Sequence, residues 1–293
     1  MKSNIILKIR LNLEYFLVFI IYKIISILPI FFVSLVGGIL FAIIGPYTKT
    51  QKIVKKNYLH IFPLATKKQI SKETQLCWFN MGKTFFELLI LPKIIFSKDK
   101  IQVEGLNNIH EVIKKNEQVI FVGIHQSNWE ILLPTIDKLG IKVGGIYRHI
   151  NNPYINKLIL KIRQKCIISN KSFYTPKGKQ SAKEIIDGIK NGLSIVLLVD
   201  QKDSAGEIVP FFNKLSKTQV GFLKVARKHK MRIVPVQNIR KNNNNFKIQF
   251  YPPIDKFSKE ISDIEAMKKI HIIIEKWIKD NPSSWFMQHN RFN

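Results

Sequence analysis

The stretch Gln118-Val119-Ile120-Phe121-Val122-Gly123-Ile124-His125-Gln126-Ser127-Asn128-Trp129-Glu130 decides how the rest of the sequence is interpreted. Its first seven residues form a short apolar run, which predicts a buried strand. His125 then stands at the carboxyl end of that strand, where open α/β sheets bind their ligands. A helix is predicted to begin at once, with Ser127 or Asn128 as its cap and Glu130 in its first turn.

The spacing of His125 and Glu130 allows two interpretations. On one continuous helix, residues five apart would point about 140° away from each other. If His125 instead precedes the cap, its ring can fold back toward the Glu130 carboxylate, which is the geometry that acid/base chemistry needs. The same letters also fit a capping box, in which Ser127 and Glu130 only close the start of a helix.

The chain beyond Ile101 predicts an α/β fold, because short apolar runs alternate with amphipathic segments. The expected strands are residues 118–124, 144–147, 194–199, 232–237 and 246–251. The expected helices are residues 131–139, 153–164, 179–191, 220–230 and 263–279, preceded by a helical stretch at 66–91.

The N-terminal region predicts a membrane anchor. Between Tyr15 and Tyr47 the only charged residue is Lys23, and Ile24 to Ile44 is an apolar run of 21 residues, close to the ~20 that a bilayer span requires. We therefore divide the chain into an anchor, residues 1–48, and a main domain, residues 49–293. A single tilted span, two short helices broken near Lys23 and Pro29, and a buried helix pair all remain open, because basic residues flank both sides.

The composition limits the possible partners. The 47 Lys and Arg residues against 20 Asp and Glu give a net charge of +27, which attracts anions such as nucleic acid, anionic lipid or an acidic carrier protein. A hydrophobic content of 46% excludes a disordered chain. The two cysteines, Cys77 and Cys166, have neither disulfide-framework nor zinc-ligand spacing.

Over almost its whole length the sequence resembles the lipid A biosynthesis lauroyl/myristoyl acyltransferases, within the lysophospholipid acyltransferase superfamily. The block from His125 to Glu130 matches the superfamily's H-x4-D/E motif. Other blocks follow the family's order: Asn57 to Pro63, Glu87, Tyr147-Arg148, Asn151 to Pro153, Arg163, Asp200 to Asp203, Val209 to Phe212, Thr218, Pro282 to Trp285 and His289 to Arg291.

The resemblance implies a glycerolipid-acyltransferase-like mixed sheet flanked by helices, with one or more N-terminal membrane helices. It implies transfer of a fatty acyl chain from an acyl carrier protein thioester to a hydroxyl of a lipid A precursor, at the cytoplasmic face of a bacterial inner membrane. His125 would act as general base, oriented by Glu130. Substrate contacts would come from Arg148, Arg163, Asp200, Asn128, Asn151, Asn152 and Gln201.

No metal, cofactor or nucleic acid is expected in this scheme. The sequence has no G-x-S-x-G motif and no cysteine near a histidine, so direct transfer without an enzyme nucleophile is preferred. Asn151 and Asn152 could instead be turn and cap residues before Pro153. The alternatives for the whole protein are an acyltransferase for another glycolipid or a lysophospholipid, and a non-catalytic basic membrane-binding protein.

Overall fold

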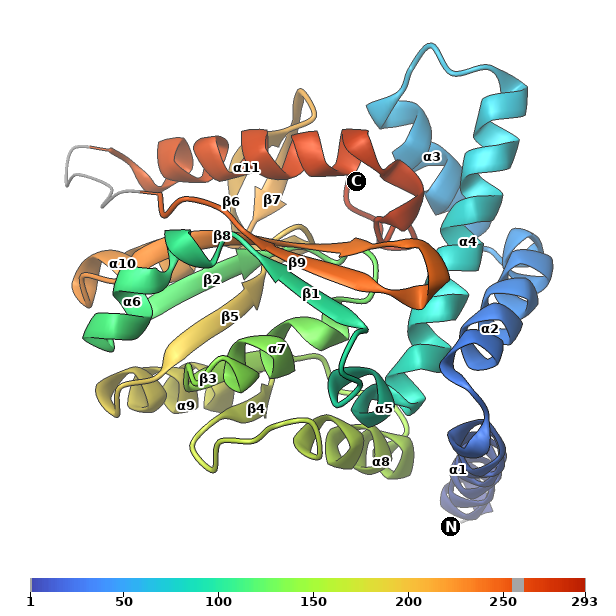
Figure 1. The fold of residues 1–293 in the computed structure, drawn as a ribbon. Coiled ribbons are helices and arrows are strands. Elements are labelled where there is room, and N and C mark those ends of the chain that lie inside the picture. The colour runs from blue at the N-terminus through green and yellow to red at the C-terminus, as the bar shows by residue number, and fades with distance from the viewer. Residues whose placement is uncertain (1, 255–260, 293) are drawn as a thin grey trace.

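A computed structural model describes residues 2–254 and 261–292 and contains a mixed sheet of seven strands in the order β1-β9-β8-β2-β5-β3-β4 (Figure 1). The strands are β1 (Ile101–Glu104), β2 (Val119–Gly123), β3 (Val143–Tyr147), β4 (Phe173–Pro176), β5 (Ser194–Leu198), β8 (Arg232–Arg240) and β9 (Phe246–Phe250). Five neighbouring strands are parallel, while β9 is antiparallel to β8 and parallel to β1. The predicted α/β class and mixed sheet are confirmed.

Both faces of the sheet are covered, as the apolar strands require. In β2, Ile120 and Val122 face one hydrophobic cluster, while Val119 and Phe121 face the other. The first cluster includes α11 (Asp263–Asp280) and α10 (Gly221–Lys228), and the second includes α7 (Leu132–Lys138) and α8 (Pro153–Gln164). Figure 1 shows α11 on one side of the sheet and α7 and α8 on the other.

The remaining helices and one hairpin complete the fold. The hairpin of β6 (Lys202–Phe211) and β7 (Lys214–Thr218) forms a separate two-stranded sheet. The other helices are α1 (Lys2–Ile27), α2 (Ile30–Ile44), α3 (Gln51–Ile61), α4 (Lys67–Leu89), α5 (Leu91–Ile95), α6 (His110–Lys115) and α9 (Lys179–Lys190). The strands and helices predicted from sequence are all present to within a few residues, whereas β1, β4, β6 and β7 were not predicted.

The N-terminal region consists of two helices broken at Pro29, as in the two-helix alternative, although α1 is 26 residues long rather than short. Residues Ile30–Tyr47 are long and apolar enough to cross a membrane, with a mean hydropathy of 2.2. Most large side chains of this segment are exposed, and the buried face of α2 carries Val33, Ser34, Gly37 and Gly38.

Helix α2 packs closely on α4. A methyl group added at Gly82 of α4 would lie 2.0 Å from the backbone oxygen of Gly37. Only glycine permits this approach, which is the usual device where helices meet in a membrane. The face of α2 that carries Ser34, Gly37 and Gly38 is therefore fixed against the main domain.

Candidate active site

The carboxyl ends of the central parallel strands bring the polar side chains together. His125 follows β2 by two residues, Asp200 follows β5 by two residues, and Arg148 comes directly after β3. Because β2, β5 and β3 are adjacent and parallel, these residues meet at one edge of the sheet. The structure thus places these residues at the edge of the sheet where sequence analysis expected them.

His125 is paired with Asp200. Its Nδ1 lies 2.8 Å from Asp200 Oδ1, and the backbone N–H of His125 donates to the same oxygen at 3.1 Å. Trp285 Nε1 donates to Asp200 Oδ2 at 2.8 Å, so the carboxylate, which is 1% exposed, accepts three hydrogen bonds. Burial alone would raise the pKa of Asp200, but the interactions with His125 and Trp285 outweigh it and hold that pKa below its usual value.

The pairing fixes the tautomer of a neutral His125. An ionised carboxylate only accepts hydrogen bonds, so Nδ1 carries the proton that is donated to Asp200. The lone pair then resides on Nε2, and the ring lines the cavity described below. A histidine held in this way can accept a proton from a bound hydroxyl.

Glu130 does not orient His125, contrary to the sequence-based expectation. Its two oxygens accept hydrogen bonds from Arg163 Nε at 2.7 Å and Nη2 at 2.6 Å, with both side chains about nine-tenths buried. Burial lowers the pKa of Arg163, yet the charge of Glu130 more than offsets this and raises it. The guanidinium also lies 5.3 Å from the ring centroid of Tyr147. The Arg163 guanidinium, which lines the cavity described below, is thus held in place by Glu130.

The turn after His125 explains the change of partner. Ser127 has φ 54°, in the left-handed region, and Asn128 caps a single 3₁₀ turn at residues 129–131. The Ser127 hydroxyl accepts from the backbone of Arg240 instead of from Glu130, so no capping box forms. The carboxylate that reaches Nδ1 comes from the neighbouring strand, where sequence spacing carries no information about side-chain distance.

His125 and Glu130 line the same cavity, which has a volume of about 430 Å³. Much of its wall is apolar: the lining includes Phe85, Leu88, Leu132, Leu133, Ile146 and Leu198. Its polar lining includes Arg148, Arg163, Gln201 and His289. An apolar cavity with a few convergent polar groups suits a substrate that has a hydrocarbon chain and a polar reacting end.

The other predicted contact residues fall into two groups. Arg148 and Gln201 line the cavity, and among the described residues the Arg148 side chain has no ion pair. Asn128 is fully buried behind the cavity wall. Asn152 caps α8 and bonds to α1, as in the cap alternative, while Asn151 is exposed and outside the cavity lining. Direct substrate contact by Asn128, Asn151 or Asn152 is not supported by these positions.

The C-terminal segment supplies two site residues that sequence reasoning left without a role. Trp285 holds Asp200, and His289 Nε2 accepts the backbone N–H of Lys202 at 3.0 Å. Burial lowers the pKa of His289 to about 4, against the opposing effect of Asp200. A neutral His289 therefore carries its proton on Nδ1. In the sequence, the blocks Pro282 to Trp285 and His289 to Arg291 were the signal that could have pointed to these two residues. A block of sequence does not show which side chains its residues bind.

Within residues 2–254 and 261–292, no group of three or more His, Cys, Asp or Glu side chains is arranged to hold a metal ion. Both cysteines are buried, and burial raises the pKa of Cys166 to about 12. A thiol with so high a pKa is a poor nucleophile.

A half-buried histidine held by a buried carboxylate, beside a largely apolar cavity at the carboxyl edge of a helix-covered sheet, is an arrangement suited to an α/β enzyme. A family model described as bacterial lipid A biosynthesis acyltransferase matches residues 4–293, and the chain belongs to this family. It is therefore an acyltransferase that acts on lipid.

The chain is similar to the crystal structure of the 1-acyl-sn-glycerophosphate acyltransferase PlsC from Thermotoga maritima, at 18% identity and a TM-score of 0.38, over 84% of this chain and 98% of that one. No curated protein sequence matches the chain.

Proposed function

We propose that the protein transfers a fatty acyl chain from an acyl carrier protein thioester to a hydroxyl of a lipid A precursor, with His125 as the general base. The observation that supports this most directly is that His125 is paired with Asp200 and lines a largely apolar cavity. The family match supports the lipid acceptor.

In the proposed reaction, His125 Nε2 takes the proton of the acceptor hydroxyl while the hydroxyl oxygen attacks the thioester carbonyl carbon. The carbon–sulfur bond then breaks, and the proton on Nε2 passes to the departing thiolate. Asp200 stabilises the imidazolium that exists between these steps. General base catalysis of this kind contributes roughly 10²-fold to 10⁴-fold to the rate.

Glu130 takes part in this scheme through Arg163. The bidentate pair fixes the guanidinium in the cavity wall, where its positive charge stabilises the oxyanion that forms on the thioester carbonyl. Arg148 and the net charge of +27 would attract the anionic acceptor and an acidic carrier protein. Nucleic acid, metal and cofactor have no part in the proposal.

The proposed location is the cytoplasmic face of a bacterial inner membrane, with residues 1–48 as the anchor. One apolar helix of sufficient length and the exposed apolar side chains of α1 and α2 support membrane attachment. The contact of Gly37 with Gly82 makes this anchor continuous with the main domain, residues 49–293.

The test uses membranes that contain the full chain, radiolabelled acyl carrier protein and a lipid A precursor. His125→Ala should lower acyl transfer by at least about 10²-fold, whereas His110→Ala, which alters an exposed histidine on α6 outside the cavity, should not. Transfer by the His125 variant at the wild-type rate would refute the proposed base. A wild type that prefers acyl coenzyme A, or a lysophospholipid, would refute the proposed donor or acceptor.

A further inference from the structure

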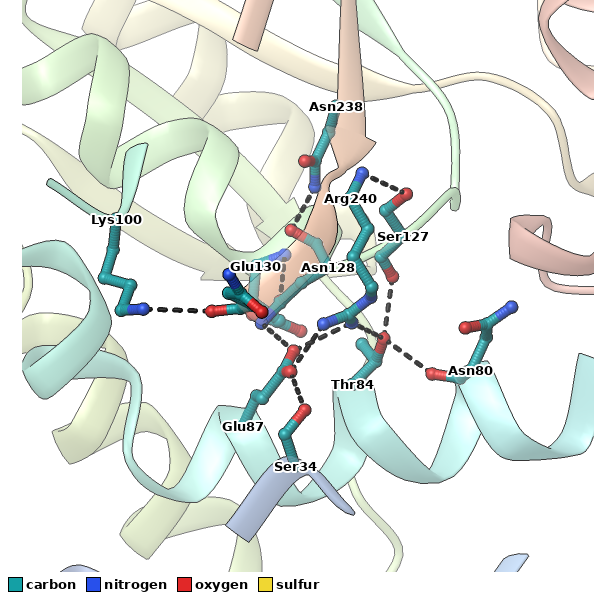
Figure 2. A network of polar contacts seen from close by, with 11 residues as sticks. Ser34, Asn80, Thr84, Glu87, Lys100, Ser127, Asn128, Glu130, Asn238 and Arg240 are labelled. Carbon is teal, nitrogen blue, oxygen red and sulfur yellow. Dashed lines mark hydrogen bonds and ion pairs between the residues drawn. The ribbon is translucent and has the colours of Figure 1, made fainter. Parts of the chain in front are cut away.

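Behind the cavity wall, a buried carboxylate joins four parts of the chain. Glu87 of α4 is 0% exposed and accepts hydrogen bonds from Ser34 Oγ of α2, Asn128 Nδ2 at 3.0 Å, and Arg240 Nη1 and Nη2 of β8 at 2.5 and 2.8 Å (Figure 2). Neither Glu87 nor Arg240 lines the cavity. A buried ion pair of this kind adds little net stability by itself, so its position beside the active-site turn calls for another explanation.

The same network holds the turn between His125 and Glu130. Thr84 Oγ1 donates to the backbone oxygen of Ser127 at 2.7 Å, and the backbone N–H of Arg240 donates to Ser127 Oγ at 3.1 Å. Figure 2 shows Ser127 and Asn128 enclosed by Thr84, Glu87, Asn238 and Arg240. Ser127 has a left-handed backbone, which side-chain-bearing residues rarely adopt unless their surroundings impose it.

Asn128 transmits the position of Glu87 to Glu130. A carboxylate only accepts hydrogen bonds, so the Asn128 amide must direct Nδ2 toward Glu87. Its Oδ1 then accepts the backbone N–H of Glu130 at 3.2 Å. The amide therefore joins a fixed charge on α4 to the residue that holds Arg163.

Helix α2, which we propose as part of the membrane anchor, contributes Ser34 to this network. Ser34 lies one turn from Gly37, which meets Gly82 of α4 at backbone distance, so Ser34 has little freedom to move away from Glu87. The helix that is long and apolar enough to span a membrane is therefore bonded to the carboxylate that supports the active-site turn.

We propose that the Glu87 and Arg240 pair, completed by Ser34 of α2, is a positioning device that sets His125 and Glu130 at their working separation in the cavity. The inference rests on the proposed function and adds residues that touch no substrate. Membrane insertion of α2 and the geometry of the turn are coupled through Ser34, so α2 contributes to turnover as well as to attachment.

The experiment compares kcat, KM and thermal unfolding for full-length protein in detergent, with E87Q, the double variant E87L/R240M, and S34A. The double variant removes both charges together and so avoids an unpaired buried charge. We expect both Glu87 variants to lower kcat by about 10²-fold, the effect of displacing a reacting group by about 1 Å, with KM unchanged because the cavity lining is intact. We expect the melting temperature to fall in E87Q and to recover in E87L/R240M.

Two variants keep the test independent of misfolding. S34A retains both charges and removes one hydrogen bond to Glu87. It should lower kcat about threefold to tenfold, which corresponds to the net contribution of a single hydrogen bond. D263N breaks the Arg227 and Asp263 pair between α10 and α11, away from the cavity, and should lower stability without changing kcat.

The outcomes separate this inference from the proposed function. Recovery of kcat together with the melting temperature in E87L/R240M, or wild-type kcat in S34A, would show that the network is only structural. Absence of acyl transfer by the wild type would refute the proposed function instead. Low kcat in a double variant of normal stability supports the positioning role.

Discussion

Replacing Asp200 by asparagine changes charge and hydrogen bonding at His125 with almost no change in volume. The carboxylate accepts from His125 Nδ1 and the His125 backbone through Oδ1, and from Trp285 Nε1 through Oδ2. Asparagine keeps one acceptor oxygen and places an NH₂ group at the other position. If the NH₂ faces Trp285, two donors oppose each other; if it faces His125, the ring must move its proton to Nε2.

Either arrangement harms the proposed base. A proton on Nε2 removes the lone pair that accepts the substrate proton, and the neutral amide no longer stabilises the imidazolium. The comparable change in a serine protease triad costs about 10⁴-fold in kcat. We expect a loss of about 10³-fold to 10⁴-fold in D200N, which corresponds to about 4 to 5.5 kcal/mol in the activation barrier.

The assay is acyl transfer in membranes, with kcat and KM measured separately. Asp137→Asn is the matched control, because Asp137 is also buried and accepts three hydrogen bonds, from the Ile168 and Ser169 backbones and the Ser172 hydroxyl, outside the cavity. D137N should lose stability and keep its kcat. If D200N retains more than about a tenth of the wild-type kcat, Asp200 does not support the base as we reason.

Three further predictions concern stability. E130Q leaves Arg163 unpaired and should lower the free energy of unfolding by about 3 to 5 kcal/mol; unchanged denaturant unfolding would contradict the buried pair. G82A should lower the free energy of unfolding by about 1 to 3 kcal/mol, because the added methyl group would collide with the Gly37 backbone oxygen. A wild-type melting temperature in G82A would show that α2 does not pack on α4 as described. Burial lowers the pKa of His271 to about 4, so the unfolded state binds its proton first as the pH falls. Stability should therefore drop between about pH 6.5 and pH 4, by up to about 3 kcal/mol from this group, and H271Q should flatten that part of a stability profile.

Much of the fold could be predicted because the strands are apolar on both faces. The run 118–124 predicts β2 from seven residues, and the structure places its alternate side chains in two separate clusters. Strands β1 and β4 escaped prediction because each has only four residues at an edge of the sheet. The β6 strand, Lys202–Phe211, has mainly polar and small residues in its first half and gives no apolar pattern.

The gathering of the candidate site residues at one edge of the sheet could be predicted from sequence, but their hydrogen-bond partners could not. Strand ends predict which residues reach the same edge, and His125, Arg148 and Asp200 do so. The choice between Glu130 and Asp200 as the histidine's partner depends on a left-handed residue at Ser127, which no local preference of serine predicts. The role of Trp285 depends on a contact across 85 residues of sequence.

The three buried carboxylates around the turn differ in one respect that bears on the chemistry. Glu87 and Glu130 are each neutralised by a guanidinium that is always charged, Arg240 and Arg163 respectively. Among the described residues the ion-pair partner of Asp200 is a histidine, so the pair becomes neutral only when His125 holds a second proton. Proton transfer from an alcohol to His125 creates that balance inside a mostly apolar cavity, where charge interactions are strong. An arginine in the position of His125 would stay charged and could not take up a proton. The kind of partner that each carboxylate has, more than the number of charges, is therefore the reason why we propose His125 as the reacting group.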